Sequence, residues 1–192
     1  CVFSERDIFS WRRLCYTALM LIGQKANDAL NEQIGYEFSA SLPYVAIAAY
    51  FETEGLTELA DLFHQQSTEE RDHAMRFVKY VTDAGGALKI PGIPAPRAEF
   101  SDACDAIGLS LESEQRVTQQ INSLVNLAIS EGDHITQNML NWFVAEQLEE
   151  VSSMGTLLTV AKRAGDNLLY VEEYVARHKQ SLLGKSGGGE AN

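Results

Sequence analysis

The sequence predicts an all-α protein: a bundle of four long helices followed by a short fifth helix. Apolar residues recur every three or four positions in four long segments, which is the period of an amphipathic helix. Glycines separate these segments, except between the second and third, where residues 87–100 hold three of the four prolines. That stretch, if extended at roughly 3.3 Å per residue, can run the length of the bundle. We therefore expect two helical hairpins joined by one long crossover.

Composition limits the classes of function. The chain has 192 residues, which suits one domain, and a formal net charge of −12. This charge argues against nucleic acid as a partner and favours cations, metal ions among them. The longest apolar run, residues 14–23, is about half of what a membrane-spanning helix needs, so no membrane is expected. Three scattered cysteines (Cys1, Cys15, Cys104) form no disulfide framework, which favours a reducing compartment, the cytoplasm.

The two ends of the chain differ from its middle. Residues 1–23 have the outline of a leader peptide or of an extension, since translation could begin at Met20. Residues 182–192 form a Gly-rich tail, flexible by composition. The remaining residues, 24–181, are expected to form the helical domain.

The first helix is expected over 26–51, with Glu37 on its apolar stripe. Tyr44 lies two turns further on the same face. It is read as a core aromatic, although beside a metal a buried phenol can also donate a hydrogen bond or an electron. Pro43 removes a backbone hydrogen bond, so we expect a bend just before Tyr44.

The second helix, ending near Ala84, carries the segment around which the prediction is organised. Glu70 and His73 lie three residues apart, so both side chains leave the same face of the helix, and Glu69 adds a second carboxylate. An imidazole beside two carboxylates provides half of a metal site.

The third helix begins after Ser101 and Asp102, either of which could cap it, and carries Glu114 in the middle of its stripe. Gly132 is expected to end it, and Asp133 to cap the fourth helix. The stripe expected for the fourth helix is Met139, Phe143, Glu146, Glu150, Ser153, Leu157 and Val160. A short fifth helix is expected over about 167–180.

Each long helix thus carries an acidic residue on its apolar stripe near its midpoint. Antiparallel packing brings the midpoints together, and buried carboxylates are very costly unless cations bind them. The converging set is Glu37, Glu70 with His73, Glu114, and Glu146 or Glu150. Oxygen ligands with one imidazole suit iron(II) or manganese better than structural zinc.

Other pairs with the same spacing have simpler interpretations. Asp61 and His64 are expected on the solvated side of the second helix. Glu131 and His134 flank a predicted helix junction, where turn and capping roles are expected. Trp142, close to Glu146, shares the ambiguity of Tyr44.

Over about residues 24–180 the chain resembles the non-haem ferritins of bacteria, members of the ferritin-like di-iron family. The matching segments are 30–38 with Tyr44, 69–73, 114–118 and 142–150. The resemblance implies a ferroxidase centre whose first iron site is Glu37, Glu70 and His73. The second site would share Glu70 and add Glu114 and Glu150. The third would use Glu69, Glu146, Glu149 and Glu150, with Gln147 as a hydrogen-bonding neighbour and Tyr44 as the family's tyrosine.

The resemblance also implies a reaction and an assembly. Two or three iron ions would bind per subunit, O₂ would oxidise Fe(II) to Fe(III), and ferric mineral would collect inside a hollow homo-oligomer of twenty-four subunits. Haem is not expected, because Arg71 stands where bacterioferritins have their haem methionine. Gln137 and Leu140 stand where animal ferritins have channel carboxylates.

Three alternative functions fit the sequence less well. A non-catalytic ferritin shell subunit would lack ligands, and none is missing. A DNA-protecting mini-ferritin would lack the fifth helix and often carry a basic tail, whereas this chain is acidic. A di-iron oxygenase would usually have two E-x-x-H motifs, and only one is convincing here.

Overall fold

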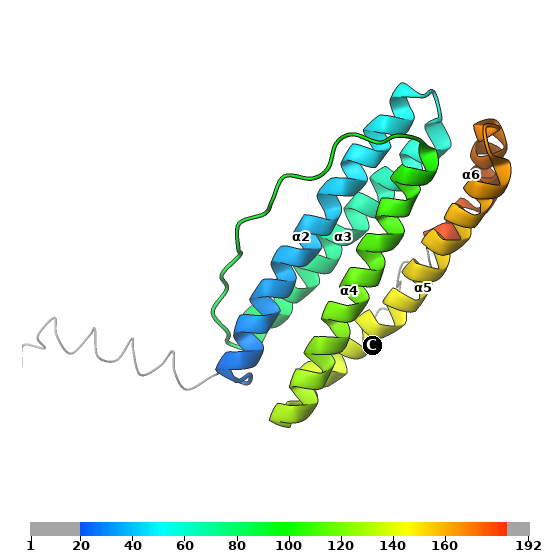
Figure 1. The fold of residues 1–192 in the computed structure, drawn as a ribbon. Coiled ribbons are helices and arrows are strands. Elements are labelled where there is room, and N and C mark those ends of the chain that lie inside the picture. The colour runs from blue at the N-terminus through cyan, green and yellow to red at the C-terminus, as the bar shows by residue number, and fades with distance from the viewer. Residues whose placement is uncertain (1–19, 184–192) are drawn as a thin grey trace, which may run out of the picture.

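The computed structural model describes residues 20–183, which form five helices and no strand. The helices are α2 (Gln24–Thr53), α3 (Thr57–Asp83), α4 (Ala103–Glu131), α5 (His134–Ala164) and α6 (Leu168–Leu182). Four long helices lie side by side and α6 packs at one end of the bundle (Figure 1). The predicted all-α bundle with a short fifth helix is confirmed. The predictions for the leader or extension and for the Gly-rich tail concern residues 1–19 and 184–192, which are outside the described residues.

The connection between α3 and α4 is the predicted crossover, and it runs along the outside of α2 (Figure 1). Asn31 fixes its start, because the side-chain amide donates to the Ala87 carbonyl at 2.8 Å and its Oδ1 accepts from the Lys89 backbone amide at 2.5 Å. Further along, Gly35 admits the ring of Pro91: a Cβ on Gly35 would lie 2.2 Å from Pro91 Cγ. The crossover is thus held against α2 by specific contacts.

The predicted start of α4 and the predicted junction between α4 and α5 are also confirmed. Asp102 caps α4 by accepting from the Asp105 amide at 2.8 Å. Asp133 caps α5 by accepting from the Thr136 amide at 2.9 Å. Between these helices Gly132 takes a left-handed conformation, φ 67°, which favours glycine. The segment from 131 to 134 therefore serves as a turn and cap, as expected.

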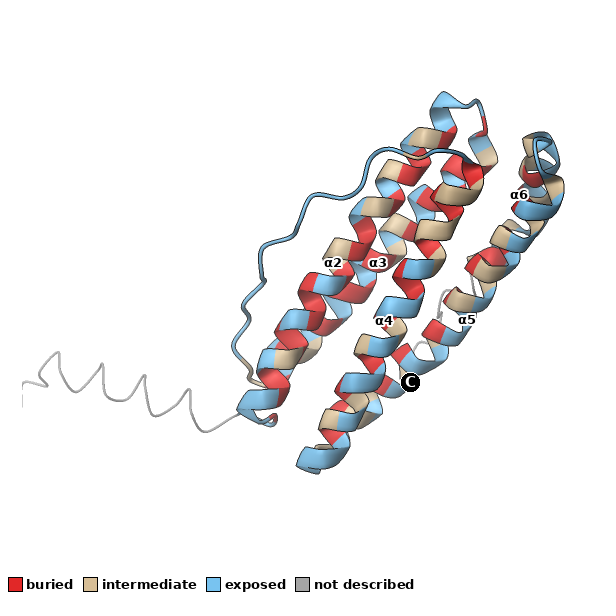
Figure 2. Cartoon of the chain, viewed as in Figure 1, coloured by how far each residue is buried: buried red, intermediate tan, exposed pale blue. Residues whose placement is uncertain are grey.

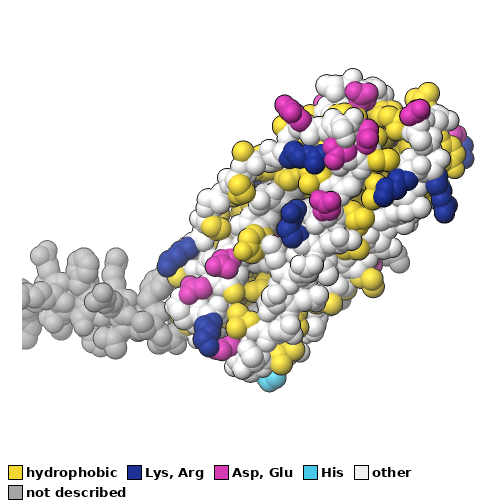
Figure 3. Space-filling view, viewed as in Figure 1, with side chains coloured by type: hydrophobic (Ala, Val, Ile, Leu, Met, Phe, Trp, Pro, Cys, Tyr) yellow, Lys and Arg dark blue, Asp and Glu magenta, His cyan; other side chains and the backbone are white. Residues whose placement is uncertain are grey.

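Buried stripes on the four long helices face one another, and the crossover is exposed (Figure 2). On the face that carries the crossover, acidic and basic side chains are interspersed (Figure 3).

No helix within residues 20–183 combines the length and apolar character needed to cross a membrane. The helix α2 continues through Pro43, and the bend expected there stays a prediction.

The inward face predicted for α5 is confirmed at Phe143, Glu150 and Leu157, and its other positions were wrong by about one residue. The buried positions of α5 include Leu140, Gln147 and Met154, whereas Met139, Glu146 and Ser153 are only half-buried. Met139 and Trp142 pack from the side against an apolar cluster instead of filling its centre. Leu140 is fully buried inside this subunit, so its side chain is not on the surface of the described structure.

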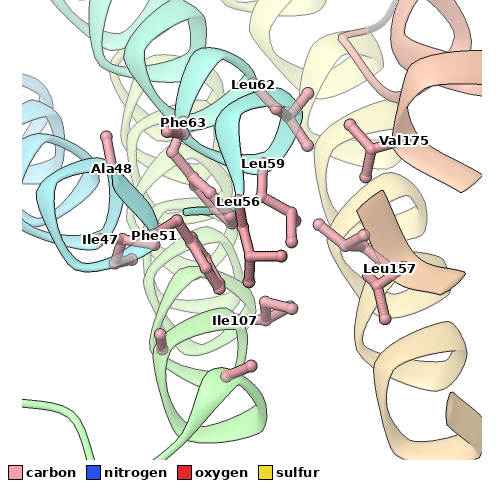
Figure 4. Packing of buried hydrophobic residues seen from close by; sticks show 14 of the residues in the cluster. Ile47, Ala48, Phe51, Leu56, Leu59, Leu62, Phe63, Ile107, Leu157 and Val175 are labelled. Carbon is pink, nitrogen blue, oxygen red and sulfur yellow. The ribbon is translucent and has the colours of Figure 1, made fainter. Parts of the chain in front are cut away.

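Two apolar clusters fill the interior. The α6-end cluster takes its residues from 44–63, 103–107 and 154–182, and Figure 4 shows Phe51, Phe63 and Leu157 among them. The far-end cluster takes its residues from 22–40, 77–84 and 117–143. On α3, α4 and α5 the buried polar residues of 66–73, 110–114 and 147–150 lie between the two clusters, and on α2 Glu37 lies near their border. The interior therefore has a polar layer at the middle of the bundle.

Candidate metal centre

Five acidic or imidazole side chains of the polar layer are almost completely buried. Glu37 comes from α2, Glu70 and His73 from α3, Glu114 from α4, and Glu150 from α5. The side chains of Glu37, Glu70 and Glu114 are 0% exposed. His73 is 5% exposed and Glu150 is 3% exposed. Each side chain is held at this depth because the apolar clusters on either side fix the helix that carries it.

The structure brings these residues into two overlapping groups. Glu37, Glu70 and His73 offer ligand atoms that all lie within 4.8 Å of one another. His73, Glu146 and Glu150 form a second group by the same measure. Both groups could hold a metal ion, and His73 is common to them.

Several polar atoms of these groups have no hydrogen-bond partner among residues 20–183. They are Oε2 of Glu37, both carboxylate oxygens of Glu70, Nδ1 of His73 and Oε2 of Glu150. His73 Nδ1 lies 3.8 Å from Glu70 Oε2, which is too far for a hydrogen bond. A buried, unpartnered polar atom costs free energy, and cations bound to the two groups would give these atoms partners.

Burial also dominates the electrostatics. It raises the pKa of Glu37, Glu70 and Glu150 well above the usual carboxyl range, and the neighbouring carboxylates add to the effect. Burial raises the pKa of Glu69 to about 7. Without a cation these groups therefore resist ionisation, and a cation that binds must displace protons.

Glu114 is held differently. It accepts a hydrogen bond from the Tyr44 hydroxyl, and Gln147 Nε2 lies 3.4 Å from its Oε2. Thr118 in turn donates to Gln147 Oε1 at 2.7 Å, which fixes the orientation of the amide. Tyr44 is thus both a core aromatic and a donor to a carboxylate, and burial raises its pKa well above the usual value.

The other predicted site residues lie at the edge. Glu69 and Glu146 are half-buried and Glu149 is exposed. Neither Glu69 nor Glu149 belongs to the two groups of described residues above, nor does Glu114. Glu69 is nevertheless close enough to His73 and Glu146 for their charges to act on its pKa.

Sequence reasoning did not single out two buried glutamines. Gln33 Nε2 donates to Glu37 Oε1 at 2.8 Å, and Gln66 Nε2 donates to Glu69 Oε2 at 2.6 Å. Each lies about one turn before its glutamate, a spacing that could have drawn attention to both.

Trp142 joins α5 to the imidazole. Its ring meets His73 edge-on at a centroid distance of 5.4 Å, and the Arg76 guanidinium, from α3, lies 3.9 Å from the centroid of the indole. By contrast Asp61 and His64 are exposed, on the solvated side of α3 as predicted.

Comparison with known proteins agrees with this architecture. A family profile described as "Ferritin-like domain" matches residues 27–164. The chain belongs to the ferritin family. It is 43% identical over 153 residues to ferritin BfrB of Mycolicibacterium smegmatis, covering 80% of this chain and 84% of that protein. It is 35% identical over 155 residues to a bacterial non-heme ferritin of Staphylococcus aureus, covering 80% of this chain and 93% of that one.

Solved ferritin structures have the same fold. An open-pore ferritin from Archaeoglobus fulgidus superposes with a TM-score of 0.79 at 32% sequence identity, covering 82% of this chain and 98% of the other. The resemblance seen in the sequence is thereby confirmed, because this ferritin covers 84%, 93% and 98% of the lengths of these three relatives.

Proposed function

We propose that this ferritin oxidises Fe(II) with O₂ in the polar layer and stores the ferric product inside a homo-oligomeric cage of twenty-four copies. One observation carries the proposal. Glu37, Glu70 and His73, from two helices, bring buried and largely unpartnered ligand atoms within 4.8 Å of one another. The apolar clusters on both sides bury this layer, and a bound cation would compensate for the charge of its carboxylates once they ionise.

The ligand chemistry favours iron as the substrate. Carboxylate oxygens with a single imidazole suit Fe(II), which is also readily oxidised. Each Fe(II) gives one electron to O₂, so two ions held together supply the two electrons that take O₂ to hydrogen peroxide. Reduction to water requires a second pair.

Three iron positions are proposed. The first is Glu37, Glu70 and His73; the second is Glu70, Glu114 and Glu150; the third is Glu69, Glu146, Glu149 and Glu150. Both oxygens of Glu70 lack a partner in residues 20–183, so one oxygen can serve each of the first two positions. Glu114 keeps its place through Tyr44 and Gln147.

The names of the relatives support the same proposal. They include ferritins and a bacterial non-heme ferritin, which agrees with iron storage. A non-catalytic shell subunit is the main alternative, and it differs in a single measurable respect, the absence of fast oxidation.

The experiment is an anaerobic Fe(II) titration followed by admission of air, on wild type, Glu70→Ala and Asp72→Ala. Asp72 is an exposed carboxylate on the same helix and serves as the matched control. We expect two or three tightly bound irons per subunit and fast ferric absorbance in wild type and in the control. Glu70→Ala should lower the oxidation rate by at least about 100-fold, because the first and second proposed iron positions lose a shared ligand. Equal, slow oxidation in all three proteins would contradict the proposal.

A further inference from the structure

The two buried glutamines stand out because each donates to one oxygen of a carboxylate in the polar layer. Gln33 is 1% exposed and Gln66 is 0% exposed. Their amides reach Glu37 Oε1 at 2.8 Å and Glu69 Oε2 at 2.6 Å. Once the carboxylates are ionised, the amide nitrogens must face them, because the opposite orientation would place two oxygens in contact without a hydrogen.

For Glu37 the consequence is that its two oxygens become different. Oε1 is occupied by Gln33, whereas Oε2 has no partner among residues 20–183. Glu37 is also one of the three residues of the first group of possible ligands. The amide therefore fixes the rotamer of Glu37 and leaves one oxygen for a cation.

The donor is neutral in both cases, and this matters. A lysine or arginine at the same position would also hold the carboxylate, but its positive charge would compete with a metal ion. A carboxamide nitrogen is not a cation ligand, so it orients the glutamate and leaves the negative charge in place.

Gln66 provides an independent indication that its own amide is not there for stability. Its Oε1 is buried and has no hydrogen-bond partner in the described chain, although its Nε2 is engaged by Glu69. An unpartnered buried acceptor is destabilising, and an apolar side chain of similar size would avoid that cost. The amide contributes orientation of Glu69 instead.

We infer that Gln33 and Gln66 are positioning residues for two different iron positions, Gln33 through Glu37 and Gln66 through Glu69. The inference rests on the proposed function, since it assigns these glutamates to cation binding. Ligand geometry in metal sites must be held to about 0.5 Å, and loss of a hydrogen-bonding partner behind a ligand typically lowers metal affinity by about 10- to 100-fold.

The experiment uses Co(II) as a probe that is not oxidised by the handling conditions and whose visible absorbance reports coordination. The assembled protein is titrated anaerobically as wild type, Gln33→Leu, Gln66→Leu and Gln65→Leu. Gln65 is the exposed neighbour of Gln66 on the same helix and is the matched control. We expect Gln33→Leu to raise the Kd of the tightest Co(II) site by about 10- to 100-fold and to change its absorbance. Gln66→Leu should leave that site intact and weaken a further site by a similar factor, and Gln65→Leu should match wild type.

Thermal unfolding of the metal-free proteins separates positioning from a purely structural role. Gln66→Leu should melt at the same temperature as wild type or higher, because it removes an unpartnered acceptor. If Gln33→Leu fails to assemble, Gln33→Met, which is unbranched and lacks the amide, replaces it.

Outcomes distinguish the two proposals. If wild type binds Co(II) tightly and Gln33→Leu and Gln66→Leu bind it with unchanged affinity, the positioning roles are wrong and the proposed function stands. Equal weakening of one and the same site in both variants would also overturn the assignment of the two glutamines to different positions. If wild type binds neither Co(II) nor Fe(II), both proposals are wrong.

Discussion

The α6-end cluster and the polar layer both contain completely buried side chains. The side chains of the cluster have close packing partners, whereas polar atoms of the layer lack hydrogen-bond partners. Phe51, Phe63 and Glu70 are all 0% exposed. The two phenyl rings stack at a centroid distance of 5.6 Å, so they have close partners. Glu70 has two carboxylate oxygens with no hydrogen-bond partner in the described chain.

This difference shows where stability and function reside in the bundle. The apolar clusters at the two ends supply favourable burial, and the layer between them consists of groups that are unfavourable to bury. Because both kinds of residue alternate along the same four helices, the ends hold the middle in an arrangement that it would not adopt alone. A cation that binds the layer would remove the conflict.

The largest effect should follow from breaking the α6-end cluster. Phe63→Ala removes a ring that stacks on both Tyr44 and Phe51. We expect a loss of about 3–5 kcal/mol in the free energy of unfolding, because a cavity replaces a fully buried ring. Chemical denaturation of metal-free protein at one fixed concentration measures it. Phe63→Leu, which keeps part of the volume, should lose less, and a loss below about 1 kcal/mol in Phe63→Ala would show that the cluster is not the stabilising region.

The polar layer should make the thermal stability of the metal-free protein depend on pH. Its carboxyls have a raised pKa in the folded protein, with Glu69 at about 7. The folded state therefore binds more protons than the unfolded state above about pH 4.5, and stability must fall as pH rises. We expect the metal-free protein to melt at a lower temperature at about pH 8 than at about pH 5.5.

Two controls sharpen this prediction. Glu70→Gln cannot ionise at that position, so its melting temperature should fall less over the same pH range. Added Co(II) should raise the melting temperature of wild type more at the higher pH than at the lower one, because protons compete with the cation. A metal-free wild type whose melting temperature rises over this range would contradict the raised pKa values.

The features that the sequence predicted correctly depend on local pattern. The helical period, the prolines of the crossover and the caps Asp102 and Asp133 all act within a few residues, and they were confirmed. Glu37, Glu70 and His73 lie on the buried face, as the period required.

The features that it did not predict depend on rotamers and on distant partners. On α5 the apolar pattern fitted two adjacent faces, and only packing against the neighbouring helices decides in favour of Gln147 over Glu146. The amide of Gln33 reaches Glu37 only in one rotamer, which spacing alone does not specify. The contact between Tyr44 and Glu114 joins residues 70 positions apart.

The smallest predicted effect concerns the place where α6 meets α3, another long-range contact. The residue at the N-cap of α3 is Leu56, which has no side-chain hydrogen-bond acceptor. Glu172 of α6 takes over this role: its Oε1 accepts from the Glu58 amide at 2.5 Å, and its Oε2 from the Leu59 amide at 3.1 Å. Its negative charge also lies at the positive end of the α3 dipole.

Glu172→Ala should therefore leave the first backbone amides of α3 without this acceptor and lower the free energy of unfolding by about 1 kcal/mol, the usual effect of losing a cap. Glu173→Ala is the matched control, because Glu173 pairs with Arg177 within the exposed face of α6. Denaturation at fixed concentration measures both. Fe(II) oxidation per folded subunit should stay unchanged in Glu172→Ala, since the carboxylates of the polar layer are untouched. If oxidation fell while stability did not, the contact of α6 with α3 would belong to the centre instead of to the stabilising end of the bundle.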